Sequence, residues 1–210
     1  MTEQSVEGLQ RELERLRKRV DQLEEEKVAA EPLNRDWTRH YYPSYYATTG
    51  FFLGMFGALA SLGFNVVGAW LVGLHPLQLI RVYLTFGMGE RALQLQLKGG
   101  DEGLALIVGI KLYIVTGMLL GIVFQLVLSR LADRDSLAKR LLIASVLGLA
   151  VWVVNYYLLL SWIQPLLFGG NWIVRETPWW VAALTHLVFG WTMAVLYPLG
   201  KYEPYQVRMD

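Results

Sequence analysis

Four long runs of apolar residues, each free of charged side chains, dominate the hydropathy pattern of the chain. No Lys, Arg, Asp or Glu occurs in the runs 40–80, 112–129, 141–174 and 177–200. A helix that rises ~1.5 Å per residue needs roughly 20 residues to cross a ~30 Å hydrocarbon core. The pattern predicts an all-α, polytopic membrane four-helix bundle over residues 46–200. Its spans are expected at about 46–72, 104–128, 141–163 and 178–199.

A heptad repeat precedes these runs. Its apolar positions follow one another at intervals of 3, 4, 3, 4 and 3 residues: Val6, Leu9, Leu13, Leu16, Val20 and Leu23. This spacing is the a/d seam of a left-handed coiled coil. With Val6 at position a, Glu12 and Arg19 at g face Arg17 and Glu24 at e of a parallel neighbour. We therefore predict a cytoplasmic coiled-coil helix over 1–30, followed by a linker over 31–45.

The oligomer number of this coiled coil stays open. Val at position a and Leu at position d favour two strands, whereas the run from Arg19 to Glu24 resembles a pattern of trimeric coiled coils. Three heptads are marginal alone, so a membrane tether or a larger partner is needed to keep the helices paired. A single solvated amphipathic helix is the alternative interpretation.

Small residues form a stripe along the first expected span. They recur at intervals of three or four positions: Gly50, Gly54, Gly57, Ala58 and Ser61. Such spacing lets another helix approach closely, either from the same bundle or from another subunit. Tyr41, Tyr42, Tyr45 and Tyr46 stand just before this span, as in the aromatic belt of a membrane interface.

The region between the first two spans has a broken pattern. Pro76 suits the first turn of a new helix, but Arg81, the Gly87-Met88-Gly89 break and the charged pair Glu90 and Arg91 interrupt the apolar residues that follow. We predict an interfacial or re-entrant pair of short helices over 76–98. A fifth span is the competing interpretation.

The distribution of basic residues favours an even number of spans. With four spans, one side of the membrane carries eight basic residues: Arg35, Arg39, Arg130, Arg134, Lys139, Arg140, Lys201 and Arg208. The other side carries four: Arg81, Arg91, Lys98 and Arg175. Positive residues concentrate in cytoplasmic loops. We therefore expect both termini in the cytoplasm, a cytoplasmic tail at 201–210 and a bacterial inner membrane as the location.

Composition narrows the chemistry. The chain has 210 residues, 54% of them hydrophobic, a net charge of +1 and no Cys. These features argue against nucleic acid as a partner and exclude disulfides and thiolate metal sites. A haem between His75 and His186 is disfavoured, because His75 lies at the membrane edge, about a dozen ångströms higher by the rise per residue. We expect no cofactor, no metal and no catalytic residue.

One polar residue in each span falls at a similar expected depth, roughly 10–12 Å below the outer edge. This candidate polar layer consists of Asn65, Lys111, Asn155 and His186; Gln125 is a further polar residue within a span. Polar side chains inside a bilayer mark function by default. However, Asn and His also join helices merely as hydrogen-bonding contacts, and Lys111 is shallow enough to reach the membrane surface.

These observations favour a non-catalytic membrane subunit that assembles or stabilises a larger complex, with lipid and other subunits or a second copy as partners. Bioenergetic assemblies contain small helical subunits of this size, which is an analogy only. A homo-oligomeric channel or small transporter that uses the polar layer is the alternative. A third hypothesis is an enzyme with His186 as base and Lys111 or Arg81 as an anion clamp. An outward-facing Lys111 would argue against the last two.

Overall fold

The structure is a computed structural model that describes residues 12–23, 42–71, 73–96, 100–133 and 135–202. The chain divides into two compact units, one of residues 1–41 with 204–210 and one of residues 42–203. Each unit is taken by itself below. The described residues are almost entirely helical and contain no strand.

The described part of the first unit is an α-helix over residues 12–23. Its seam residues Leu13, Leu16, Val20 and Leu23 expose 55%, 60%, 52% and 51% of their surfaces. Val6 and Leu9 lie outside the described residues. The helix agrees with the predicted heptad pattern, while the coiled coil itself stays a prediction.

The second unit contains the four expected apolar helices. The stretches long and apolar enough to cross a membrane are Pro43–Leu71, Gly100–Leu131, Leu137–Phe168 and Trp179–Gly200. They consist of α3 (Pro43–Leu71), α5 (Gly100–Leu131), α6 (Leu137–Val153) with η2 (Val154–Leu160) and α7 (Ser161–Phe168), and α9 (Trp179–Leu196) with η3 (Tyr197–Gly200). This confirms four helices of membrane-spanning length and composition. The third is longer than predicted and contains a π-helical turn at η2.

Glycines bring α3 and α5 into close contact. A Cβ atom built on Gly54 would lie 2.9 Å from the Cα atoms of Gly121 and Met118, and one built on Gly50 would lie 2.5 Å from Gln125 Cβ. A side chain at these positions would therefore collide with the neighbouring helix. All five residues of the predicted small-residue stripe are buried within the chain's own bundle. The stripe packs α3 against α5 and, at Gly57, against Phe189 of α9.

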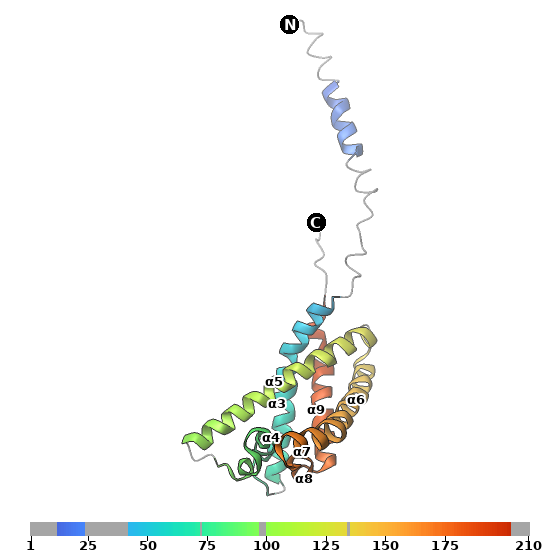
Figure 1. The fold of residues 1–210 in the computed structure, drawn as a ribbon. Helices are drawn as coiled ribbons and strands as arrows, with labels where there is room; N and C mark the ends of the chain where they lie inside the picture. Colours follow the sequence, from blue (N-terminus) through green and yellow to red (C-terminus); the bar gives the residue numbers. More distant parts are fainter. Residues whose placement is uncertain (1–11, 24–41, 72, 97–99, 134, 203–210) are drawn as a thin grey trace. The chain divides into compact units, whose positions relative to one another are not determined.

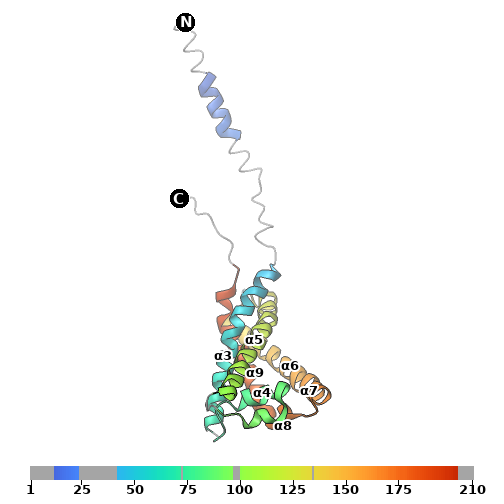
Figure 2. The same ribbon diagram turned by 60° about the vertical axis from the view of Figure 1, so that its left-hand side comes forward.

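A second pair of helices packs in the same way. A Cβ on Gly148 of α6 would lie 2.9 Å from the carbonyl oxygen of His186, and one on Gly190 of α9 would lie 2.8 Å from that of Ala144. The two pairs meet in an apolar core where Phe124 and Phe189 pack edge to face, with ring centroids 5.2 Å apart. Figures 1 and 2 show α3 and α9 side by side, with α5 oblique to α3 in Figure 1.

The predicted short helices over 76–98 are present in part as α4 (Gln78–Met88) and the 3-10 helix η1 (Gly89–Gln94). An 11-residue helix is too short for a fifth span, because ~1.5 Å per residue gives it about half the thickness of the hydrocarbon core. A further short helix, α8 (Trp172–Glu176), lies beside α4 (Figure 1). We call the end of the bundle with α4, η1, α7 and α8 the capped end.

The opposite end of the bundle holds both boundaries of the second unit. The Tyr45 hydroxyl donates to the Lys201 carbonyl at 3.4 Å, and its ring packs on Tyr202 with centroids 5.3 Å apart. Nearby, the Tyr197 hydroxyl donates to Asp133 Oδ1 at 2.7 Å and lies close to Lys201, whose ammonium donates to the Asp133 carbonyl at 3.2 Å. The first helix of the unit thus begins beside the point where its last helix ends.

Candidate functional site

A cavity of about 300 Å³ lies among the apolar helices. Its lining comes from α3, α4, α5, η2 and α9, with Ile173 of α8 and Thr177 closing one side. Among the described residues that line it there is no Asp, Glu, Lys or Arg. The lining is mostly apolar, with a small set of hydroxyl, amide and imidazole groups, which is the composition of a small-molecule site.

The first polar group of this cavity joins α3, α5 and α9. Ser61 lies two helical turns after Gly54, on the face of α3 that packs against α5, and its Oγ is 2.8 Å from the Tyr113 hydroxyl. Asn65 Nδ2 donates to the Ser61 carbonyl and to Thr185 Oγ1, both at 2.8 Å. Asn65 is 8% exposed and itself lies outside the cavity lining. It braces Thr185, which contributes to the cavity wall.

The second polar group is the pair Asn155 and His186. Asn155 lies two turns after Gly148, the residue where α6 and α9 touch, and its Nδ2 is 3.5 Å from His186 Nε2. His186 Nδ1 is 2.8 Å from the Ala182 carbonyl oxygen. Because a carbonyl only accepts, Nδ1 carries the proton, and Nε2 of a neutral ring is then an acceptor. The long contact with Asn155 leaves both groups able to bind a further partner.

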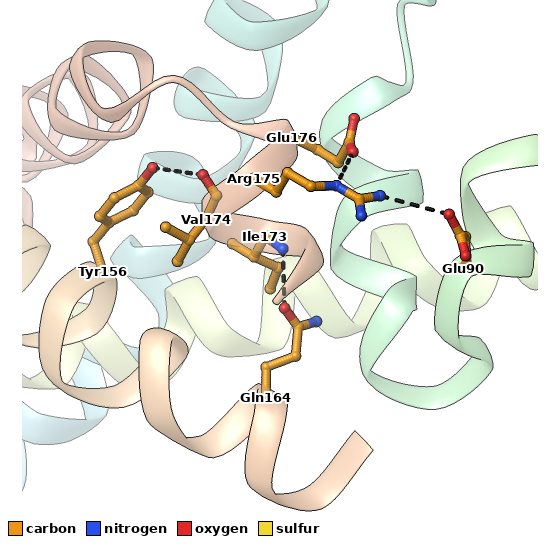
Figure 3. A network of polar contacts seen from close by, with 7 residues as sticks. All are labelled: Glu90, Tyr156, Gln164, Ile173, Val174, Arg175 and Glu176. Atoms are coloured by element: carbon orange, nitrogen blue, oxygen red, sulfur yellow. Dashed lines mark hydrogen bonds and ion pairs between the residues drawn. The ribbon is translucent and has the colours of Figure 1, made fainter. Parts of the chain in front are cut away.

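Asn155 stands in η2, the π-helical turn within the third long helix. Single π turns inside α-helices are frequent at functional sites. The next residue, Tyr156, is 5% exposed, and its hydroxyl donates to the Val174 carbonyl at 3.0 Å (Figure 3). The same hydroxyl lies 2.7 Å from the Thr177 carbonyl. These contacts tie the turn to Val174 of α8 and to Thr177, the residue that follows α8.

Two aromatic residues of α4 stand between the cavity and a neighbouring groove. Tyr83 and Phe86 line the cavity and also line an open groove of about 700 Å³ between α4 and α5. The Tyr83 hydroxyl is hydrogen-bonded to Thr116 of α5. The Tyr83 ring packs edge to face on Tyr113, with centroids 5.8 Å apart. The wall between groove and cavity is therefore a layer of aromatic side chains fastened by one hydrogen bond.

The structure brings together part of the predicted polar layer. Asn155 and His186 are in contact, and Asn65 reaches the same region through Thr185, the neighbour of His186 in sequence. Lys111 lies on the exposed face of α5, outside the cavity lining. Of the four predicted residues, Asn155 and His186 lie at the cavity and Asn65 lies behind its wall. The positive charge of Lys111 is not part of this group.

A buried amide network holds the capped end together, and we did not predict it. Gln164 of α7 is fully buried; its Nε2 donates to Thr85 Oγ1 at 2.7 Å, and its Oε1 accepts from the Ile173 backbone N–H at 2.9 Å. Figure 3 shows this contact beside the exposed ion pair of Arg175 with Glu90 at 3.6 Å. The hydrogen bond from Arg175 to Glu176 raises the pKa of the guanidinium. For Gln164, the signal available in the sequence was a single Gln within an apolar run.

Two further polar groups lie away from the cavity. Arg81 of α4 is 9% exposed, and its Nε has no hydrogen-bond partner within the described part of the chain. Burial lowers the pKa of Arg81, partly offset by Glu102. Gln125 is fully buried near Gly50 and Gly200, with both amide atoms unpaired among the described residues. Neither residue lines the cavity.

His75, just before α4, has a structural role. Its Nδ1 accepts the backbone N–H of Leu77 at 3.0 Å. Burial, and after it the charge of Arg81, lowers the pKa of His75. Within the residues that the structure describes, no group of three or more His, Asp or Glu side chains is arranged to hold a metal ion.

In comparisons with known proteins, no family model, no curated protein and no solved structure matches this chain. The chemistry of the cavity and the surfaces of the two units therefore carry the functional argument.

Proposed function

We propose that this protein is a non-catalytic integral membrane subunit that assembles or stabilises a larger membrane complex through its N-terminal helix. The observation that carries the proposal is the apolar seam of residues 12–23. Its four described seam residues are each at least half exposed, although the segment around them is rich in charge. Outside a bilayer such a seam is normally covered by another helix.

Charge pairing supports a parallel neighbour with the same heptad register. Glu12 at g meets Arg17 at e, and Arg19 at g meets Glu24 at e. Pairs of this kind set partner choice and orientation more than they add affinity. The neighbour is therefore either a second copy of the chain or a helix with the same charge order.

The packing of α3 narrows how assembly works. Its small-residue stripe is buried against α5 and α9 of the same chain, so it is not free to receive another subunit. In the proposed arrangement the N-terminal helix supplies the specific contact, and the lipid-facing surface of the bundle supplies the rest. Both termini lie in the cytoplasm, and α4 and η1 lie at the outer membrane interface, as the basic residues favour.

The first test is the mass of the purified complex in mild detergent, measured by native mass spectrometry. The intact chain is compared with a variant that lacks residues 1–30. We expect the intact chain to copurify with other subunits or with itself, and the shortened variant to lose those partners. An intact chain that is monomeric under conditions that preserve other membrane complexes would contradict the proposal.

A single substitution tests the seam more sharply. Leu16→Gln replaces a d residue, whereas Lys18→Gln places the same side chain at the solvent-facing f position. In a homodimer, each of the two chains would lose the ~1.5–3 kcal/mol of free energy gained by burying one Leu, which sums to about 3–6 kcal/mol. At ~1.4 kcal/mol per tenfold, the dissociation constant should rise ~10²- to 10⁴-fold for Leu16→Gln. Equal effects of the two substitutions would remove the coiled coil from the proposal.

The cavity favours a second candidate, a channel or small transporter that uses the polar layer. Asn155 and His186 face a space inside the bundle, as that hypothesis requires. Lys111, however, lies on the exposed face of α5, away from the cavity. This position argues against an ion path that uses Lys111 and against an enzyme that would use it as an anion clamp. Ion flux through vesicles containing the purified protein would favour the transporter, provided that His186→Leu abolishes it.

A further inference from the structure

We propose that the cavity binds the ring of a neutral, lipid-soluble quinone or quinol, whose hydrocarbon tail lies in the groove between α4 and α5. This inference is independent of the assembly role. It rests on the size of the cavity, the character of its walls, the placement of its polar groups and its position beside the groove.

Size and wall chemistry select the ring. A volume of about 300 Å³ equals the liquid volume of ~10 water molecules, and it lies at the lower end of ligand pockets. It therefore suits a substituted six-membered ring rather than a whole lipid. Aromatic side chains stand around it from four helical elements: Tyr83 and Phe86 of α4, Tyr113 of α5, Tyr156 of η2 and Phe189 of α9. Aromatic faces and edges are suited to contact with a planar ring.

Polar groups from different helices select two oxygen atoms on the ligand. Ser61 Oγ donates to the Ala58 carbonyl at 3.0 Å and lies 2.8 Å from the Tyr113 hydroxyl. The Tyr113 hydroxyl can turn its one proton from Ser61 to a carbonyl oxygen of the ligand. Asn155 Nδ2 is a second donor, and His186 Nε2 beside it is an acceptor for a hydroxyl. Both sets line the same cavity, so a ring that carries oxygens at two positions offers one oxygen to each set, either as a carbonyl or as a hydroxyl.

Charge selects a neutral molecule. The described residues that line the cavity include no Asp, Glu, Lys or Arg, and Lys111 lies outside it. An anionic headgroup placed there would lose its hydration without gaining an ion pair, which is costly in an apolar interior. A neutral quinone or quinol carries no charge whose hydration would be lost, so it avoids this cost.

The groove accounts for the tail. Its described lining is apolar apart from Tyr83 and Asp101, and it extends along α4 and α5 to Leu112. It shares Tyr83 and Phe86 with the cavity, so a ligand with its ring inside and its tail in the groove would pass between these two aromatic residues. For this passage the hydrogen bond from Tyr83 to Thr116 must break, and the ring contacts of Tyr83 with Phe86 and Tyr113 must give way.

The test measures equilibrium binding of a radiolabelled decyl-1,4-benzoquinone to the full chain in lipid nanodiscs, with empty nanodiscs as background. Unlabelled decyl-benzoquinone should displace the probe. Dodecane and decane-1,2-diol at equal membrane concentration should not. Displacement by dodecane would show that the site binds any apolar chain without recognising polar groups. Displacement by the diol as effective as that by decyl-benzoquinone would show that the site binds alcohol groups and does not require a quinone ring. Absence of saturable binding would also overturn the proposal.

Matched variants locate the site. Leu160→Trp fills the cavity, whereas Leu159→Trp adds the same side chain to an exposed neighbour that does not line it. We expect at least 30-fold weaker binding for the first and no change for the second. Asn155→Leu and His186→Leu should each weaken binding about five- to tenfold, as expected for one lost hydrogen bond. Equal effects of the two Trp variants, both monodisperse and equally heat-stable, would place the site elsewhere.

A third comparison tests the tail. Val108→Trp narrows the groove but not the cavity. It should weaken binding of the decyl probe and leave binding of a tail-less dimethyl-1,4-benzoquinone unchanged. Equal losses for both probes would overturn the assignment of the groove to the tail.

Discussion

Replacing Gly121 by Ala tests whether the contact between α3 and α5 determines the stability of the bundle. A Cβ atom at Gly121 would lie 2.5 Å from Gly54 Cα and 2.8 Å from Gly54 N. Ordinary contacts of a Cβ atom begin near 3.4 Å, and the carbonyl oxygen of Gly50 is closer to the new Cβ than either Gly54 atom. The helices must therefore separate locally by more than about 0.9 Å, the difference between 3.4 Å and the 2.5 Å to Gly54 Cα, to accept the methyl group. The obstacle is backbone, and no flexible side chain can move aside in its place.

The expected loss follows from this separation. A radial gap of ~0.5–1 Å forfeits about a quarter to a half of the attraction between the atoms on its two sides. Overpacking of one methyl group in a close-packed contact typically costs about 1–3 kcal/mol. Gly63→Ala is the matched control, because it lies on α3 and its new Cβ would meet no atom within 4 Å. It should be neutral or slightly stabilising.

The assay is reversible unfolding in mixed micelles of mild detergent and dodecyl sulfate, followed by fluorescence of the eight Trp residues. We expect Gly121→Ala to lose about 1–3 kcal/mol relative to the unsubstituted chain. A free energy of unfolding for Gly121→Ala equal to that of Gly63→Ala would refute the close contact, and with it the arrangement that places Ser61 beside Tyr113.

Two predictions concern the capped end. Burial lowers the pKa of His75, so its neutral form is favoured in the folded state. The free energy of unfolding should therefore fall as the pH drops below the ordinary value of 6.5, and hydrogen exchange at the Leu77 amide, corrected for intrinsic rates, should rise. His75→Ala should remove this pH dependence. Gln164→Leu should cost about 1–3 kcal/mol and expose the Ile173 amide to exchange, whereas Gln94→Leu on the exposed side of η1 should leave both unchanged.

The fold could be predicted where one physical requirement decided it. A span needs a long apolar run, and four such runs gave four long helices whose predicted limits differ from the observed ones by at most five residues. The paired glycines of α3 also indicated a close helix contact, and the structure shows that α5 fills it. The long helices and the close helix contact could be predicted because each depends on the residue types within one segment of the chain.

The turn at η2 and the helix α8 were not predictable in the same way. A π-helical turn has no composition of its own, and α8 is five residues long. Tertiary contacts hold both: Tyr156 binds the backbone at Val174, and Gln164 binds the backbone at Ile173. Side chains that are distant in sequence therefore decide these elements, so local propensity carries little information about them.

Lys111 shows why equal depth did not identify the site. Depth along a helix says at what level a side chain lies, whereas helical phase says which way it points. At ~100° per residue, Leu106 and Phe124 lie about 140° around α5 from Lys111, and both are at most 1% exposed. Lys111 is therefore nearly opposite the packed face. Asn155 and His186 satisfy both conditions, because Gly148 places α6 against α9 at the level of His186. Agreement of depth and phase is the criterion that assigns these two residues, and not Lys111, to the cavity.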